Sequence, residues 1–162
     1  MSIIFYRVDE RLIHGQVVVG WGNSLKIDQI VLANDLVVRN PWERELYLAC
    51  VPPEIKAVII PVDDAISRIK ENGFEGKRIL VLVDSPFDIL RMVEEGVGID
   101  RLNVGGVHSK AGRAKVLPYL YLSTEEISAF KKIIARGIRC ECRDVLLAEK
   151  HDLALLFDKL GW

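Results

Sequence analysis

Residues 3–16 read Ile3-Ile4-Phe5-Tyr6-Arg7-Val8-Asp9-Glu10-Arg11-Leu12-Ile13-His14-Gly15-Gln16, and this stretch decides the fold that the chain predicts. Its first part, Ile3 to Val8, is rich in β-branched and aromatic residues and predicts a strand. A charged turn follows, and the apolar segment from Val17 to Trp21 predicts the beginning of a helix. A strand, a polar turn and a helix in this order are typical of a parallel α/β domain.

The same alternation continues along the chain. Three further apolar runs, at 27–33, 57–61 and 79–83, predict strands, and their continuous Val, Ile and Leu content is typical of strands covered on both faces. A fifth, shorter strand is predicted over 101–104. We therefore predict an α/β fold with an open, mainly parallel central sheet flanked by helices on both faces. The active loop is expected after the first strand, and residues 1–162 are predicted to form a single domain.

Capping residues mark the helix boundaries. Asparagine and serine favour the position just ahead of a helix, and proline is favoured in the first turn. Helix starts are predicted at Asn40-Pro41, at Ser85-Pro86 and at the capping box Ser123-x-x-Glu126. Glycines that can adopt a positive φ predict helix ends at Gly96 and Gly137.

Two later segments depart from this alternation. Residues 115–122 are rich in Val, Leu and Tyr, and Pro118 favours an edge position in a sheet. Apolar and charged residues alternate over 138–145, which predicts a strand exposed on one side. Cys140 and Cys142 fall on its apolar face, which favours packing because no His/Cys cluster completes a zinc site. No metal and no cofactor is predicted.

Composition limits the classes of function. The 22 Lys and Arg residues against 23 Asp and Glu leave a formal charge of -1, which argues against broad binding to nucleic acid. The chain starts without a basic leader, and no stretch reaches the ~18 uncharged apolar residues of a transmembrane helix. The three cysteines show no disulfide framework. We therefore expect a cytoplasmic protein.

The turn after the first strand offers the groups that phosphoryl transfer needs. Ligands of parallel sheets bind in the loops that follow the strands. An ordinary histidine, with a pKa of about 6.5, is largely neutral near pH 7, so the imidazole of His14 can attack phosphorus. Arg11 offers donors for phosphate oxygens, and Asp9 can orient either side chain. The predicted phosphate-binding loop around these three catalytic candidates comprises Arg7, Glu10, Gly15 and Gln16.

A second loop, over 103–110, is a further candidate. Its backbone N–H groups would face the same phosphate if the fifth strand ended in the same crevice. The candidate contacts are Gly105, Gly106, His108 and Lys110. A glycine turn that joins two strands explains this pattern equally well, and isolated histidines are most often surface residues.

The segment RVDERLIHGQVVVGW, residues 7–21, resembles the opening signature of the mannose/fructose/sorbose-type IIB components of the bacterial sugar phosphotransferase system (PTS). A pattern close to R-[IV]-D-[DE]-R-L-I-H-G-Q-V recurs in that family. The likeness continues in order through Asn34-Asp35, Pro52-Pro53, Asn103-Val104-Gly105-Gly106 and residues 127–137. By this resemblance the phosphorylated histidine falls on His14, the phosphate-binding arginine on Arg11 and the acidic position of the motif on Asp9.

The resemblance also implies the partners. Family members accept phosphate from a histidine of a IIA component and donate it to a sugar carried by the membrane components IIC and IID. The chain is therefore expected to be a phosphotransferase, cytoplasmic or held at the inner face of the membrane through IIC and IID. No nucleic-acid partner is expected, and the sugar and the presence of a homo-oligomer stay open.

Two other functions are compatible with the same loop. A regulatory protein could report the phosphorylation state of His14 to a partner without sugar transport. A small-molecule hydrolase could use His14 as a general base, but no paired nucleophile or second carboxylate stands out.

Gly20 and Gly22 depart from the family, which often has bulkier residues there. They weaken helix propensity and predict a shortened or bent first helix around Trp21.

Overall fold

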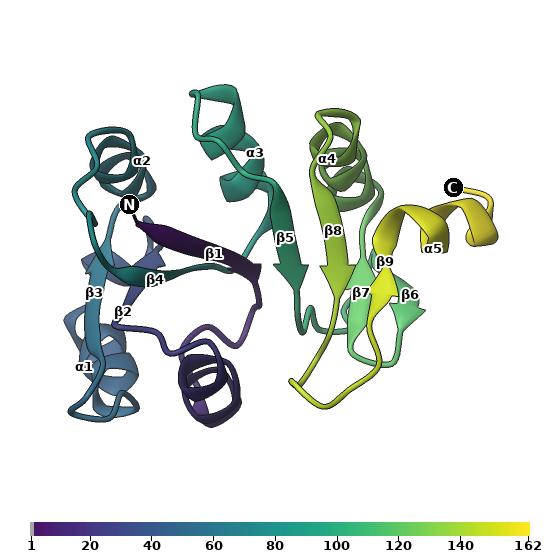
Figure 1. Cartoon of the computed structure of the whole chain (residues 1–162). Helices are drawn as coiled ribbons and strands as arrows, with labels where there is room; N and C mark the ends of the chain where they lie inside the picture. Colours follow the sequence, from purple (N-terminus) through teal and green to yellow (C-terminus); the bar gives the residue numbers. More distant parts are fainter. Residues whose placement is uncertain (1) are drawn as a thin grey trace.

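The computed structural model of the protein describes residues 2–162 and is built around a seven-stranded sheet (Figure 1). The strand order is β3-β2-β4-β1-β5-β8-β9, and every neighbouring pair is parallel except β8 and β9. The strands are β1 (Ile3–Val8), β2 (Gln29–Ala33), β3 (Lys56–Ile60), β4 (Arg78–Val83), β5 (Arg101–Val104), β8 (Arg139–Cys142) and β9 (His151–Asp152). The predicted open, mainly parallel sheet is confirmed.

Helices cover both faces of this sheet (Figure 1). One apolar core joins the sheet to α2 (Val62–Lys70), α3 (Pro86–Glu94) and α4 (Thr124–Ala135). A second core, on the opposite face, joins it to η1 (Gln16–Gly22), η2 (Val37–Arg39) and α1 (Pro41–Ala49). Alternate residues of β2 enter the two cores, because successive side chains of a strand point to opposite faces. The last helix, α5 (Leu153–Leu160), contacts β8 and β9.

The order of the strands creates a crevice between β1 and β5. These two strands are parallel neighbours, paired at Arg7 with Asn103 and at Val8 with Val104. The chain leaves β1 toward β2 on one side of the sheet and leaves β5 toward β8 on the other. Because the two connections diverge, the loops after these strands leave an opening at the carboxyl edge, which is where ligands bind in such sheets.

The predicted strands and caps agree closely with the structure. β1 and β5 have the predicted bounds. β2 begins at Gln29 rather than at Ile27, because the backbone N–H of Ile27 donates to the carbonyl of Gly22 at the end of η1. The side chains of Asn40, Ser85 and Ser123 cap α1, α3 and α4 as predicted, and Gly96 and Gly137 adopt a positive φ behind α3 and α4.

The segment over 115–122 forms a hairpin rather than one edge strand. β6 (Ala114–Leu117) and β7 (Leu120–Leu122) make a separate two-stranded antiparallel sheet, and Pro118 lies in the turn between them. A proline lacks the N–H group that a strand interior needs, so the turn is a favourable position for it. The backbone N–H of Val107 donates to the carbonyl of Tyr119, and its carbonyl accepts from the N–H of Tyr121, which ties the hairpin to the loop after β5.

The glycines beside Trp21 do not shorten the first helix, contrary to one part of the expectation. Residues 16–22 form a π-helix, a wider helix that is rare and occurs frequently at functional sites. A Cβ atom on Gly22 would lie 3.3 Å from the Ile55 side chain and 3.6 Å from the carbonyl of Val17. Glycine at this position therefore lets the wide helix pack closely against its neighbours.

The other predicted strand, 138–145, is confirmed in part. β8 ends at Cys142, and its two cysteines are buried and free, as the packing interpretation requires. Burial raises the pKa of the Cys140 thiol to about 12, so this side chain is an inert core residue.

Within residues 2–162, no helix has both the length and the apolar character that crossing a membrane requires.

The capping box of α4 makes a prediction about stability. The Ser123 hydroxyl accepts from the backbone N–H of Glu126 at 3.1 Å, so Ser123→Ala should lower the free energy of unfolding by about 1 kcal/mol, measured by urea denaturation. Ser128→Ala, at an exposed position inside the same helix, is the control and should not destabilise. Equal losses in both variants would contradict the assignment of the cap.

Candidate functional site

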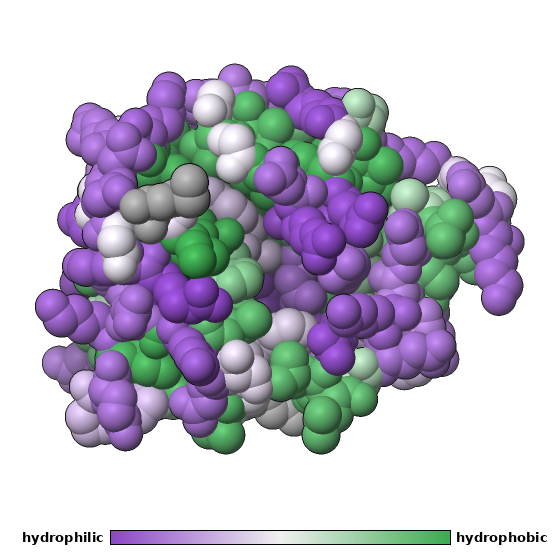
Figure 2. Space-filling model, viewed as in Figure 1, coloured by the Kyte–Doolittle hydropathy of each residue, from purple (hydrophilic) through white to green (hydrophobic). Residues whose placement is uncertain are grey.

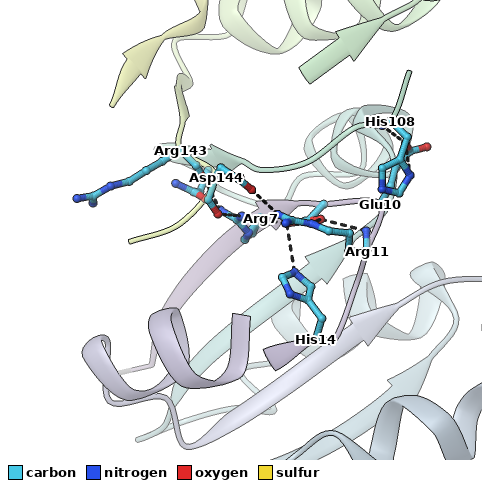
Figure 3. Close-up of polar contacts among 9 residues, drawn as sticks. Arg7, Glu10, Arg11, His14, His108, Arg143 and Asp144 are labelled. Carbon is cyan, nitrogen blue, oxygen red and sulfur yellow. Dashed lines mark hydrogen bonds and ion pairs between the residues drawn. The ribbon is translucent and has the colours of Figure 1, made fainter. Parts of the chain in front are cut away.

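The loop after β1 is anchored by two apolar side chains. The backbone N–H of Leu12 donates to the carbonyl of Asp9 at 3.0 Å, which closes a tight turn. Leu12 has a φ of 56, a value that is strained for a leucine, and both Leu12 and Ile13 are buried in the core beneath η1. Burial of these two residues offsets the strain and fixes the chain between Arg11 and His14, which Figure 3 labels.

Arg7 is a buried cation at the end of β1. Its guanidinium is 1% exposed and donates to the carboxylate of Asp9, to the side chain of Asn103 and to the carbonyls of Arg143 and Asp144. Asp9 directly follows β1, and the other acceptors lie on β5 and on the loop after β8. Burial lowers the pKa of Arg7, and the neighbouring carboxylate of Asp9 opposes that effect. Arg7 therefore binds three segments of the chain together rather than facing a ligand.

Trp21 closes the other side of Arg7. The Arg7 guanidinium lies 4.9 Å from the centre of the Trp21 ring, and that of Arg143 lies 5.6 Å from it, both in cation–π contact. Trp21 also lines a cavity of about 680 Å³ with polar side chains of β5 and β8: Arg101, Asn103 and Glu141. Figure 2 shows a hollow near the centre of this view, with hydrophilic residues on its right and hydrophobic residues on its left.

Asp9 is the central acceptor of the site. Its carboxylate is fully buried and accepts from Arg7 Nη2 at 2.9 Å, and from the backbone N, Nε and Nη2 of Arg11 at 3.0, 2.9 and 2.8 Å. Burial by itself would raise the pKa of Asp9, but His14, Arg11 and Arg7 outweigh it and hold this pKa well below its usual range. Asp9 is therefore ionised and keeps Arg11 in one orientation.

His14 lies beside the same carboxylate at the start of η1. Its Nε2 atom is 3.6 Å from Oδ2 of Asp9, beyond hydrogen-bond length, and has no hydrogen-bond partner among the residues that the structure describes. This nitrogen is buried, yet the side chain as a whole remains 21% exposed. The ring therefore turns one nitrogen toward Asp9 while part of it is open to the surface.

The second loop approaches the first through its glycines. The backbone N–H of Gly105 donates to the carbonyl of Val8 at 2.7 Å, and that of Glu10 donates to the carbonyl of Gly106 at 2.8 Å. A Cβ atom on Gly105 would lie 2.6 Å from Cζ of Arg7, closer than carbon atoms pack. The glycine pair thus permits close contact with Arg7 and Arg11, and the two loops meet at the carboxyl edge of the sheet, where the N–H group of Gly105 is bound to Val8.

Glu10 is held away from the reactive edge. Its carboxylate accepts from Arg113 at 2.8 and 3.0 Å and from the backbone N–H of His108 at 2.6 Å. Arg113 also pairs with Glu126 of the α4 capping box. A carboxylate so engaged does not bind phosphate, so Glu10 instead fastens the second loop to the first.

The remaining predicted contacts are at the surface. His108 is 63% exposed, with Nδ1 3.5 Å from Glu10, and Lys110 is exposed in the same loop. Gly15 is exposed at the start of η1 with nothing within 4 Å of the position of a Cβ. The side chain of Gln16 lies outside the part of the chain that the structure describes. Among the described residues, no His, Cys, Asp or Glu side chains group to hold a metal ion.

Sequence reasoning missed Arg113 as a partner of Glu10 and missed Asp144 altogether. The Asp144 carboxylate pairs with Arg11 Nη2 at 2.7 Å. Asp144 comes two residues after the end of β8, which is parallel to β5. Loops after neighbouring parallel strands meet at one edge, so this position was a signal that could have identified it.

Comparison with known proteins shows one family. The family model described as "PTS system sorbose subfamily IIB component" matches residues 3–161. The chain is 33% identical over 160 residues, 99% of its length, to the mannose-specific EIIAB component of Escherichia coli. It is 26% identical over 160 residues, 99% of its length and 98% of the relative's, to the sorbose-specific EIIB component of Lacticaseibacillus casei.

The solved structures agree with this match. The IIBSor domain of the sorbose permease from Klebsiella pneumoniae superimposes with a TM-score of 0.92 and 27% identity, over 98% of both chains. The chain spans about half the length of the mannose-specific relatives, of which the alignment covers 50%.

Gly105 supplies a test of the site's packing. Gly105→Ala should lower the free energy of unfolding by about 1–3 kcal/mol, because the new methyl group would collide with Arg7 and Asp9. Gly98→Ala, where nothing lies within 4 Å of the added Cβ, is the matched control and should leave the urea midpoint almost unchanged. A Gly105 variant as stable as this control would show that the close approach is not needed.

Proposed function

The chain belongs to the family of PTS sorbose-subfamily IIB components, and from that premise we propose that it carries a phosphoryl group on His14 between a donor protein and a sugar. The observation that supports this most is the junction of three side chains at the carboxyl edge of the sheet. His14 and Arg11 both contact Oδ2 of the buried Asp9, at 3.6 and 2.8 Å.

Nδ1 is the nitrogen that we assign as the nucleophile. Nε2 is buried and faces the Asp9 carboxylate, so this nitrogen carries the ring proton and has no room for a phosphoryl group. The lone pair is then on Nδ1. A carboxylate that orients a histidine through the opposite nitrogen is a recurring arrangement in catalysis by imidazole.

Arg11 is proposed to stabilise the transferring group. Phosphoryl transfer spreads negative charge over three equatorial oxygens, so fixed cationic donors supply most of the catalysis. Three hydrogen bonds to Asp9 hold Arg11 before any phosphate arrives, and 27% of its side chain is exposed. The hydrogen bond to Asp9 raises the pKa of Arg11, so the group stays charged.

The transfer takes place in two steps. A bond forms between Nδ1 of His14 and phosphorus as the bond from phosphorus to the donor's histidine breaks. A sugar hydroxyl then attacks phosphorus and loses its proton to water, and Nδ1 takes back the electron pair of the breaking P–N bond. We propose a IIA component as the donor and a sugar presented by membrane IIC and IID components as the acceptor, since IIB components act with these partners.

Phosphorylation of variants tests this proposal. Wild type incubated with the upstream phosphorylated PTS proteins should gain one phosphoryl group, on Nδ1 of His14 by mass mapping and phosphorus NMR, and His14→Ala should gain none. His108→Ala and His151→Ala replace the other two histidines and should be labelled normally. Label retained by His14→Ala would overturn the proposal, and label on Nε2 would overturn the assignment of the nucleophile.

Arg11 gives a kinetic test. Arg11→Ala should slow phosphorylation of His14 by about 100-fold, the usual effect of losing one donor to a developing anion. The urea midpoint should change little, because Arg11 lies at the surface and Asp9 keeps its pair with Arg7. Quench-flow rates equal to those of wild type would remove Arg11 from the mechanism.

A further inference from the structure

Asp144 occupies the outer side of Arg11. Its Oδ1 atom lies 2.7 Å from Arg11 Nη2, the length of a charge-assisted hydrogen bond, and the same nitrogen donates to Asp9 at 2.8 Å. Figure 3 shows Asp144 and His14 on different sides of the Arg11 side chain. Asp144 comes from the loop after β8, far from the first loop in sequence.

Arg11 does not need Asp144 to keep its orientation. Asp9 accepts from the backbone N, from Nε and from Nη2 of Arg11, and Asp9 itself is fully buried. The side chain of Asp144 is 30% exposed, so its ion pair is close to the surface and contributes little stability. The Asp144 carboxylate therefore affects the site in a way other than by orienting Arg11 or stabilising the fold.

That effect is on charge. Arg7 and Arg11 are the cations of the cluster, and Asp9 and Asp144 are its anions, so the resting cluster is neutral. A phosphoryl group on His14 adds up to two negative charges beside it. The cluster gains a net positive charge only if one carboxylate withdraws, and Asp9 cannot, because it is buried and bound to Arg7.

We propose that the Asp144 carboxylate occupies, while His14 is unphosphorylated, the position on Arg11 that the phosphoryl group takes. When His14 is phosphorylated, this carboxylate rotates away from Arg11 into solvent. This inference rests on the proposed function of His14. By competing for Arg11, Asp144 makes phosphohistidine less stable and so favours passing the group on.

The surrounding contacts allow this movement. The backbone carbonyl of Asp144 accepts from Arg7 Nη2 at 2.9 Å, so the buried cation holds the main chain in place. Only the partly exposed carboxylate has to rotate, and it moves into water where its charge is solvated. The loop after β8 therefore does not have to unfold when the phosphoryl group replaces the Asp144 carboxylate on Arg11.

Neutralising Asp144 tests the proposal. With a phosphorylated IIA protein as donor, Asp144→Asn should shift the transfer equilibrium toward phosphorylated His14 by roughly three- to tenfold, the effect of removing a like charge near the surface. The ratio of the two phosphorylated proteins is read by phosphorus NMR. Asp144→Glu, which keeps the charge, should stay close to wild type.

Glu149→Gln is the matched control. Glu149 is exposed, comes from the same loop, and makes no hydrogen bond or ion pair in the part of the chain that the structure describes, so its loss of one charge should not move the equilibrium. An equal shift of the transfer equilibrium in Glu149→Gln would mean that the shift reflects the net charge of the protein, and it would overturn the proposal. An Asp144→Asn variant that is phosphorylated to the same extent as wild type, or to a lesser extent, would also overturn it. A wild type that takes no label on His14 overturns the proposed function itself.

Discussion

The buried ion pair between Arg7 and Asp9 is the constraint on which the rest of the site depends. Removing one partner of such a pair leaves an uncompensated charge and costs about 3–5 kcal/mol. An exposed pair, such as that of Arg11 with Asp144, contributes at most about 1 kcal/mol. The first pair therefore fixes the loop after β1 against β5 and the loop after β8, while the second, between partly exposed side chains, contributes far less to the stability of the fold.

This difference in burial gives the side chains of the site different roles. Asp9 is fully buried and immobile, and it orients both Arg11 and His14 from beneath. Arg11 and His14 are partly exposed, so both side chains are accessible from the surface. The strained backbone of Leu12 lies between them and is held by the core under η1. The six residues from Asp9 to His14 therefore include both a buried supporting carboxylate and two partly exposed side chains.

Patterns that depend on near neighbours predicted much of the molecule. The bounds of β1 and β5, the caps at Asn40, Ser85 and Ser123, and the gathering of His14, Arg11 and Asp9 in one loop all follow from short-range sequence. The engagement of Glu10 by Arg113, and of Arg7 by acceptors after β5 and β8, did not. Those contacts join residues 96 to 136 positions apart, whose pairing depends on strand order.

The sequence alone determined the fold class and pointed to a candidate reactive group, because hydrophobic periodicity, capping residues and the chemistry of an imidazole beside a guanidinium are all local properties. Tertiary structure decided which charged side chains are free to meet a phosphoryl group and which are already bound. Arg7, Glu10 and Asp144 look alike in a sequence as charged residues near strand ends. Only the parallel order of β1, β5 and β8 buries the first, binds the second to Arg113 and sets the third on Arg11.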